Sequence, residues 1–260
     1  LEISGKLATA GLSTVTEATN IQTSAMNAFA SENLSAAQVS DILFKTVKAG
    51  KTTISELATG VGATASIVQS ANVRLADFQA ATAALTTTGT PATQAQTQLR
   101  ASIVALQKPT KEMEKVFKAL GVTSDKELIA KYGDLGSSFD AINTKVQELG
   151  LNTAKTWSST EALAAVTSLT GATNESYVKT LDNMVNGSNA LNEAYDKQAK
   201  TGKNSMQIAK NNMKALSITI GTTLIPIITD LVEAVSPVIE RVSTWVPQNR
   251  GTVKTIMKVP

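Results

Sequence analysis

Two glycine-containing segments and two pairs of carboxylates are the residues of this chain whose types and spacing could do chemistry. The segment Ala49–Thr53, Ala-Gly-Lys-Thr-Thr, resembles the end of a phosphate-binding loop. That loop requires a glycine five positions before Gly50, and Lys45 stands there instead, so the backbone cradle for a phosphate is missing. We therefore interpret Gly50 as the left-handed residue that ends one helix, and Thr53 as the residue that begins the next.

The segment Gly60–Ala65, Gly-Val-Gly-Ala-Thr-Ala, resembles part of a dinucleotide-binding turn. Such a turn follows a β-strand and opens the helix of a βαβ unit. No strand pattern precedes Gly60, and no βαβ pattern surrounds it. We therefore expect a loop between helices at this position.

The carboxylate pairs Glu112 with Glu114, and Asp125 with Glu127, could suggest acid–base catalysis. Each pair lies in the first turn of an expected helix, where acidic side chains interact favourably with the helix dipole, so we interpret them as solvated cap residues. The chain contains no cysteine and no histidine, which removes thiolate nucleophiles, the common zinc sites and the usual general base. We expect a protein that is not an enzyme, with no catalytic, cofactor-binding or metal-binding residues and no cofactor.

The composition predicts packed helices that each bury little area. Of the 260 residues, 42% are apolar and 17% are charged, so a packed or partner-covered structure is expected. Aromatic residues make up 4%, and much of the apolar content is alanine, which buries little surface. We expect such helices to need neighbours from other chains. The net charge of +3 is spread along the chain, which argues against specific nucleic-acid binding.

Capping patterns mark the helices that must position these residues. Ser35 with Gln38, and Thr53 with Glu56, each form a capping-box pattern at a helix start. The apolar positions of the first of these helices are Val39, Ile42, Leu43 and Val47.

The clearest amphipathic pattern predicts a single helix from Thr64 to Thr88, ended by Gly89. Its stripe has spacings of three and four and consists of Val68, Ala71, Leu75, Phe78, Thr82 and Leu85. Pro91 lies where a first-turn proline costs no hydrogen bond, and Pro109 ends the helix that Pro91 opens. The apolar positions of that helix are Ala95, Leu99, Ile103 and Leu106.

Short helices with clear ends follow in the middle of the chain. One ends at Gly121 and has the apolar positions Met113, Val116, Phe117 and Leu120. Ser124 caps the next, and a third ends at Gly150 with the apolar positions Phe139, Ile142, Val146 and Leu149. Ser158 with Glu161 opens another helix.

These signals predict an all-α fold of multiple short amphipathic helices followed by a longer, proline-kinked apolar helix, assembled as a homo-oligomeric bundle. We expect a helical core segment at 1–122 and a segment of short, glycine-punctuated helices at 123–203. The long apolar helix is predicted at 204–246 and a tail at 247–260. The glycines and prolines before residue 203 indicate a compact or folded-back array rather than one rod.

The long helix contains an uncharged run, Ala215–Thr229, and is expected to kink at Pro226 and Pro237. Five lysines precede this run: Lys197, Lys200, Lys203, Lys210 and Lys214. The run is shorter than the roughly 20 residues that cross a bilayer, so we expect a helix buried between copies of itself or under a partner protein. Transient contact with a host membrane through Ala215–Val246 stays open.

Thr97-Gln-Leu-Arg100 is followed by Lys108-Pro-Thr-Lys-Glu-Met-Glu114 and then by Lys118-Ala-Leu-Gly-Val122. This order of helix starts and stops resembles the core region of phage tail tape-measure proteins. Similar punctuation extends over nearly the whole chain. Its recognisable blocks are Lys6–Ser13, Ser35–Leu57, Leu75–Val122, Asn211–Leu216 and Ile218–Pro226.

The resemblance implies a structural protein of the virion. Several copies would lie in the lumen of the tail tube, set its length during assembly in the host cytoplasm, and leave ahead of the DNA at infection. The implied partners are further copies of the chain, as a trimer or a hexamer, the tail-tube protein, and tail-tip or baseplate hub proteins. The many helix breakers do not fit the continuous helical rod that would measure length, so we expect this chain to be an anchoring or ejectable segment. The chain lacks an initiating Met, and we expect it to be an excerpt of a longer polypeptide.

Two other functions are compatible with the composition. A self-assembling filament or surface protein of the flagellin kind would fit the richness in Ala, Thr, Ser and Asn, although the start of the chain lacks long heptads. A membrane-perturbing helical protein would fit the lysine-flanked run before Thr229.

Overall fold

The computed structural model describes residues 2–171 and 173–199 of the chain. Within these residues the backbone forms thirteen α-helices and one short 3-10 helix, and no strand. The predicted all-α fold is therefore confirmed.

The helices follow one another along the chain with short connections. Their bounds are α1 (Glu2–Ala10), α2 (Val15–Ala28), η1 (Ala30–Glu32), α3 (Ala36–Ala49), α4 (Ile54–Ser70), α5 (Leu75–Thr87), α6 (Ala92–Gln107), α7 (Lys111–Leu120), α8 (Asp125–Tyr132), α9 (Leu135–Glu148), α10 (Thr153–Trp157), α11 (Thr160–Leu169), α12 (Asn174–Asn186) and α13 (Ala190–Ala199).

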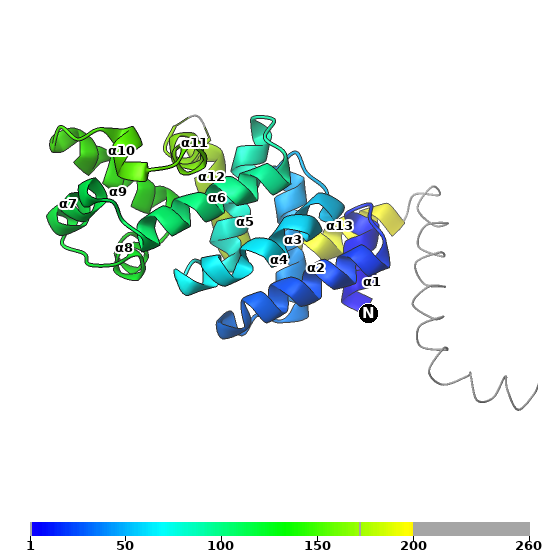
Figure 1. Cartoon of the computed structure of the whole chain (residues 1–260). Coiled ribbons are helices and arrows are strands. Elements are labelled where there is room, and N and C mark those ends of the chain that lie inside the picture. The colour runs from blue at the N-terminus through cyan, green and yellow to red at the C-terminus, as the bar shows by residue number, and fades with distance from the viewer. Residues whose placement is uncertain (1, 172, 200–260) are drawn as a thin grey trace, which may run out of the picture. The chain divides into compact units, whose positions relative to one another are not determined.

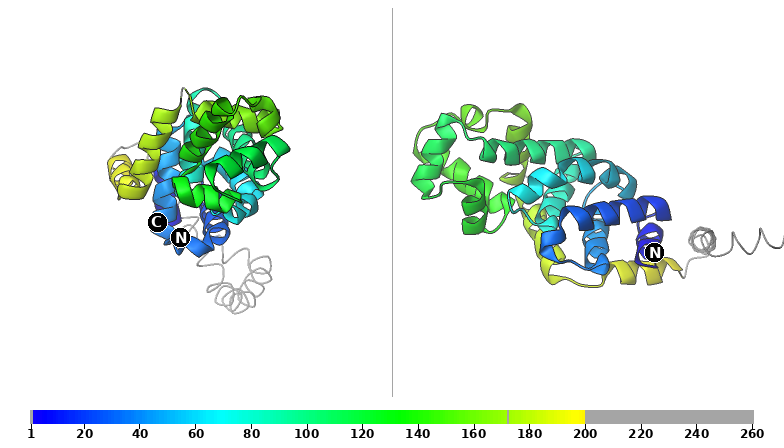
Figure 2. Two further views of the ribbon diagram at one scale, coloured as in Figure 1. Left: turned by 90° about the vertical axis from the view of Figure 1, so that its left-hand side faces the viewer. Right: turned by 60° about the horizontal axis from the view of Figure 1, so that its bottom comes forward.

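Helix α5 lies at the centre of the described helices, where it packs against α3, α6, α9, α11 and α12 (Figure 1). Helix α4 packs between α2 and α6, and α6 packs in turn against α11. The short helices α7 and α8 pack on α9, far from α1. The first and last described helices, α1 and α13, lie side by side (Figure 2). The described chain is thus folded back on itself, as expected before residue 203.

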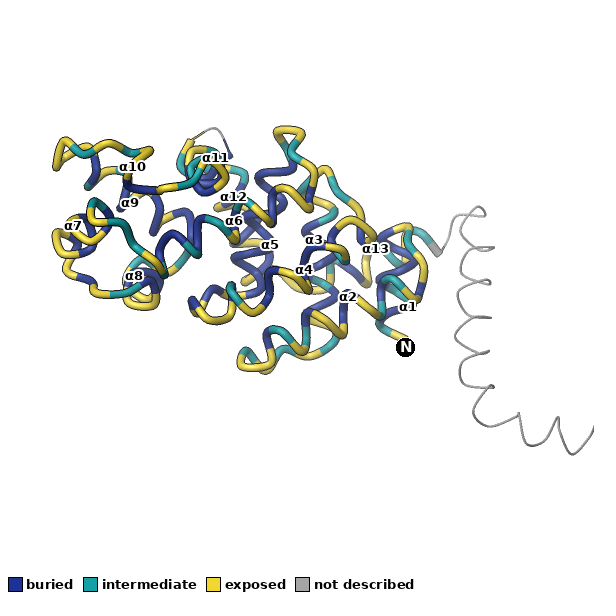
Figure 3. The backbone as a smooth tube through the Cα atoms, viewed as in Figure 1, coloured by how far each residue is buried: buried dark blue, intermediate teal, exposed yellow. Residues whose placement is uncertain are grey.

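The apolar stripes of these helices meet in one core cluster that reaches from Leu7 to Leu191. Figure 3 shows buried residues along α5, where every residue from Leu75 to Thr86 is buried. The alanines of α5 are small, so the neighbouring helices approach closely and cover one another. The described helices therefore bury their stripes within a single chain, where the sequence led us to expect cover from other chains. The homo-oligomeric bundle stays a prediction.

Several predicted helix ends are confirmed by their hydrogen bonds. Ser35 and Thr53 each cap a helix with a complete capping box, and Ser124 accepts a hydrogen bond from the backbone of Glu127. Helix α7 ends at Gly121, whose φ of 69° is the left-handed conformation that glycine adopts without strain. Local capping therefore sets these boundaries, as the sequence indicated.

The single helix predicted from Thr64 to Thr88 is wrong, because the chain breaks into α4 and α5. Asn72 adopts a left-handed φ of 59°, and the Val73 N–H donates to the Val68 carbonyl in the manner of a helix end. The stripe positions on both sides of the break are buried all the same. The apolar spacing continued through the turn, which is why periodicity alone missed it. Gly89 follows the end of α5, as predicted.

Gly50 ends α3 as predicted, but not in the left-handed conformation. Its φ is −97° and its ψ is 175°, an extended conformation that any residue adopts. The helix α5 lies too close to this position for a side chain, because an added Cβ would lie 2.5 Å from Oγ1 of Thr86 and 3.0 Å from the Cα of Ala83. Close packing against α5, rather than backbone conformation, therefore explains this glycine.

Three other boundaries differ from the expectation by small shifts. Pro91 is the residue before α6 rather than a residue of its first turn. Ser159, not Ser158, caps α11, because Ser158 ends α10 with a left-handed φ of 56°. Leu149 lies beyond the end of α9 and is 45% exposed, so it is not part of the buried stripe.

Several predictions fall on residues outside the described ranges. These are the long helix at 204–246 with its kinks at Pro226 and Pro237, the tail at 247–260, and the membrane contact through Ala215–Val246. The blocks Asn211–Leu216 and Ile218–Pro226 lie there as well. The segment boundary at residue 122 also stays a prediction.

Candidate functional site

The segment Ala49–Thr53, which resembles the end of a phosphate-binding loop, packs against the end of α5. The Lys51 N–H donates to Oγ1 of Thr86 at 3.1 Å, and Gly50 lies against the backbone of Ala83. A phosphate cradle needs a run of free backbone N–H groups that point at the ligand. Here the backbone instead joins α3 to α5, so the segment has a structural role.

The other sequence candidates also lie in regular helical structure. The segment Gly60–Ala65 is part of the interior of α4, so the loop expected there is wrong. Glu112 and Glu114 lie in the first turn of α7, and Asp125 and Glu127 lie in the first turn of α8, as predicted. Asp125 is buried there, so the expectation that it is solvated is wrong. Hydrogen bonds from the backbone and side chain of Thr123 lower the pKa of Glu127, which caps the start of α8.

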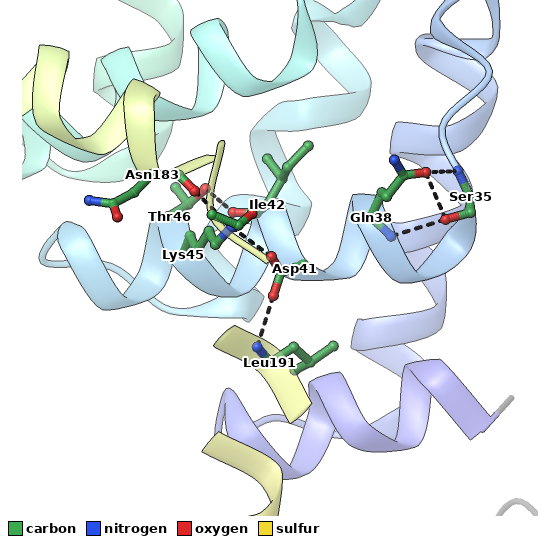
Figure 4. Close-up of polar contacts among 9 residues, drawn as sticks. Ser35, Gln38, Asp41, Ile42, Lys45, Thr46, Asn183 and Leu191 are labelled. Atoms are coloured by element: carbon green, nitrogen blue, oxygen red, sulfur yellow. Dashed lines mark hydrogen bonds and ion pairs between the residues drawn. The ribbon is translucent and has the colours of Figure 1, made fainter. Parts of the chain in front are cut away.

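Asp41 and Lys45 of α3 form a buried ion pair whose two members also bond to other parts of the chain (Figure 4). The two residues are one helical turn apart, and their side chains meet with 2.7 Å between Lys45 Nζ and Asp41 Oδ2. Only 9% of the lysine side chain and 14% of the aspartate side chain are exposed. An ion pair at this depth is stable only if its remaining hydrogen-bonding groups also find partners.

Both partners of this ion pair hold the turn between α12 and α13. Lys45 Nζ donates to the carbonyl oxygens of Asn183 and Gly187, each at 2.8 Å, at the C-terminus of α12. Oδ1 of Asp41 accepts a hydrogen bond of 2.8 Å from the Leu191 N–H in the first turn of α13. A cation thus meets the negative end of one helix dipole, and an anion meets the positive end of the next.

This arrangement leaves neither charged group available for acid–base chemistry. The three N–H groups of Lys45 are all engaged, and both carboxylate oxygens of Asp41 are engaged. A general base or nucleophile needs a free lone pair within reach of a substrate. The geometry instead serves as a clamp that fixes the α12–α13 turn on α3.

Carboxylates from distant parts of the chain cap two further helices in the same manner. Oε1 of Glu32 accepts a hydrogen bond of 2.7 Å from the Leu75 N–H at the start of α5. Burial raises the pKa of Glu32, against the Leu75 N–H and the charge of Arg74, which lower it. Oδ2 of Asp77 accepts from the Leu135 N–H at the start of α9, at 3.0 Å. Long-range caps of this kind tie the ends of the described helices to other helices.

A groove of about 500 Å³ lies beside the clamp. It is lined by apolar side chains of α3, α12 and α13, by Glu32 of η1 and by Arg74 in the turn before α5. The apolar side chains include Ile42, Met184 and Leu191. Asp41 also lines the groove, and its two carboxylate oxygens are occupied by Lys45 and the Leu191 N–H.

Metal sites and membrane-spanning helices are both absent from residues 2–171 and 173–199. No cluster of three or more His, Cys, Asp or Glu side chains there could hold a metal ion. No helix in the same part of the chain is long and apolar enough to cross a membrane.

Sequence reasoning missed the residues that carry the tertiary contacts. Lys45 entered only as a departure from a phosphate-binding motif, and Asp41 and Asp77 were not singled out. A signal was present for Asp77, which is the only charged residue between Leu75 and Leu99. A lone charge in a long apolar or neutral stretch indicates a specific buried partner.

Comparison with known protein families shows the family of this chain. The sequence model of the family described as phage-related minor tail protein matches residues 1–156, which is more than half of the chain. The matched range extends from α1 into α10 and includes Glu32, the Asp41–Lys45 pair and Asp77. No curated protein and no solved structure matches the chain. The chain therefore belongs to the phage-related minor tail protein family and is a structural component of the phage tail.

Proposed function

We propose that this chain is a segment of a tail tape-measure protein, which lies in the lumen of the tail tube, sets tail length during assembly and is ejected ahead of the DNA. The observation that carries the proposal is the family match over residues 1–156, together with the ordered blocks Lys6–Ser13, Ser35–Leu57 and Leu75–Val122 within it. A non-enzymatic role agrees with this family and with a clamp whose charged groups are saturated by structural contacts.

Within such a protein, the described helices form a folded domain rather than the ruler itself. A ruler converts residue number into length at a fixed rise of 1.5 Å per residue, so the 260 residues would reach roughly 390 Å as one rod. The longest described helix is α4, with 17 residues, or about 26 Å. The surrounding helices fold back on α5. This segment therefore acts as an anchoring or ejectable domain, and another part of the tape-measure chain measures the length.

The partners in this proposal are the ones that the location requires. Further copies of the chain, as a trimer or a hexamer, would share the tube lumen with the tail-tube protein at their sides. Tail-tip or baseplate hub proteins would contact one end of the assembly. Family membership favours this tail role over a flagellin-like filament or a membrane-perturbing protein, since neither of those is a phage tail component.

The test is an epitope tag of about 20 residues inserted after Gly150 in the phage gene; a rod would lengthen by about 30 Å for that insertion. Residues 147–150 are exposed, so the core should tolerate the insertion. We expect antibody to label the tag after triggered ejection and not in intact tails. We also expect an unchanged tail length, because the tag enters a folded domain.

Two results would contradict the proposal in different ways. Labelling along the outside of intact tails would place the protein on the tail surface and exclude the lumen. A tail lengthened in proportion to the insertion would keep the lumen but make this segment part of the ruler. Denatured tails serve as the control that the tag is present and can be recognised.

A further inference from the structure

The buried side chains of Asp77 and Tyr177 and the partly buried side chain of Asp134 join α5, the start of α9 and α12. The hydroxyl oxygen of Tyr177 lies 2.7 Å from Oδ1 of Asp77 and 2.9 Å from Oδ1 of Asp134. The second oxygen of Asp77 accepts from the Leu135 N–H at 3.0 Å, and the Gly136 N–H donates to the Tyr177 hydroxyl at 3.3 Å. We call this set of contacts the α5–α9–α12 junction. It connects residues 58 and 100 positions apart in the sequence.

The junction has too few protons if both carboxyl groups are ionised. The Tyr177 hydroxyl has one proton and two carboxylate oxygens within hydrogen-bonding distance, so it can donate to only one of them. A proton on Asp77 supplies the missing donor. Asp77 then donates to the Tyr177 oxygen, and Tyr177 donates to Asp134. With this proton, each short oxygen–oxygen contact is a hydrogen bond.

The surroundings favour that proton. Asp77 is 1% exposed, and an ionised carboxylate is costly at such depth without a cation beside it. Burial raises the pKa of Asp77 to about 7, and the charge of Asp134 raises it too. The hydrogen bonds from Tyr177 and Leu135 and the charge of Arg74 act in the opposite direction. Burial and the Asp77 charge hold the pKa of Tyr177 well above its ordinary value, so the phenol keeps its own proton.

We propose that Asp77 carries a proton in the folded protein, so that the α5–α9–α12 junction is complete below neutral pH and loosens when that proton is lost to alkaline solution. Loss of the proton leaves one donor for two carboxylates, and places an uncompensated charge in the core. The first turn of α9 and the Tyr177 side of α12 are the parts that separate from α5. This conformational device is independent of the proposed role in tail-length determination.

The direction of the pH dependence follows from the two states of Asp77. In the unfolded chain the carboxyl group has its ordinary pKa of 3.8, whereas in the folded protein the pKa is about 7. Between these values, opening releases a proton, so the folded junction loses stability as the pH rises. Its stabilisation is fully present below pH 3.8 and is lost as the pH passes about 7.

Hydrogen exchange of the Leu135 and Gly136 amides in the full chain tests the proposal. After correction for the chemical exchange rate, the opening equilibrium should rise about 30-fold between about pH 5.5 and about pH 8.5. In the Asp77→Asn variant the same amides should show little change, because the side chain no longer titrates. Asp140→Asn on the exposed face of α9 is the matched control and should behave as the wild type.

A second measurement keeps the test valid if Asp77→Asn does not fold. The carbon chemical shift of the Asp77 carboxyl group in the wild-type chain should titrate with a midpoint near 7. A midpoint near 3.8, or an opening equilibrium that does not change with pH, would overturn the proposal.

Discussion

Helices α5 and α7 are built in opposite ways. Helix α7 has an apolar stripe on one side, is capped by its own Thr110 and ends at Gly121. Helix α5 is buried on all sides from Leu75 to Thr86, and no side-chain cap comes from the residue before it. Its first N–H is satisfied by Glu32, from a distant turn. The start of α7 is capped by the residue next to it in the sequence, whereas the start of α5 is capped by a residue from another part of the chain.

The difference follows from where each helix lies. Helix α7 packs on α9 and α10 and keeps one face in water, so its sequence alternates between apolar and polar at the helical period. Helix α5 is surrounded by α3, α6, α9, α11 and α12, so it has no water-facing side to mark. Beside its stripe of Leu75, Phe78 and Leu85, the other faces of α5 carry mostly small side chains, because five neighbouring helices leave little room around the axis. Small side chains on the faces outside the stripe can therefore mark the centre of a helical domain.

The largest expected effect on stability comes from removing the aromatic side chain of α5. Phe78→Ala in α5 should lower the free energy of unfolding of the full chain by about 4 kcal/mol, because Phe78 is 1% exposed and its removal leaves a cavity. Chemical denaturation measures the change. Val178→Ala, at a position 51% exposed, is the control and should change stability by about 0.5 kcal/mol or less. A small effect of Phe78→Ala would mean that α5 is not the centre.

The next effect comes from adding volume instead of removing it. Ala80→Leu in α5 should destabilise the chain by about 2 kcal/mol, since Ala80 is fully buried among neighbouring helices. Ala119→Leu on the exposed face of α7 adds the same atoms and should be neutral within about 0.5 kcal/mol. Thermal unfolding of the two variants side by side makes the comparison. Equal effects would show that the two helices are packed alike.

A third test compares a closely packed and an open position in one helix, Gly60 and Gly62 of α4. In Gly60→Ala the new Cβ would lie 1.6 Å from Oε1 of the fully buried Gln96 on α6, so we expect a loss of about 2 kcal/mol. In Gly62→Ala no atom lies within 4 Å, so the higher helix propensity of alanine should stabilise the chain by about 0.5 to 1 kcal/mol. If the two variants shift the denaturant midpoint in opposite directions relative to the wild type, the contact between α4 and α6 is confirmed. A stabilising Gly60→Ala would instead mean that Gln96 moves aside.

The smallest effect concerns the caps. Thr110→Ala removes the hydrogen bond to the Met113 N–H, and Glu32→Ala removes the bond to the Leu75 N–H; each should cost about 1 kcal/mol. The exchange rates of nearby amides should differ more than the total stability does. Thr110→Ala should expose the first turn of α7 and, because the Thr110 hydroxyl also donates to the Thr156 carbonyl, loosen its contact with α10. Glu32→Ala should instead loosen the turn around residue 32 and the start of α5. Identical local patterns for the two variants would remove the distinction between local and distant caps.

Residues with a local partner could be predicted from the sequence, and residues with a distant partner could not. Ser35, Thr53 and Gly121 act within three or four positions of themselves, and each was identified from its neighbours. Asp41 and Leu191 are 150 positions apart, and no local pattern links them. The break at Asn72 was missed because the apolar spacing continues across it. Gly60 was assigned to a loop between helices, and the contact with Gln96 that accounts for a glycine inside α4 comes from another helix.

The sequence by itself determined the all-α class, several helix boundaries outside the centre and the resemblance to tail proteins, because helix caps and helical periodicity depend on residues a few positions apart. Only the tertiary structure decided that α5 is the buried centre, that Asp41 and Lys45 clamp the α12–α13 turn, and that Asp77, Asp134 and Tyr177 meet. These contacts depend on how the helices pack in space, and the energies that select one packing come from buried area and paired charges far apart in the chain.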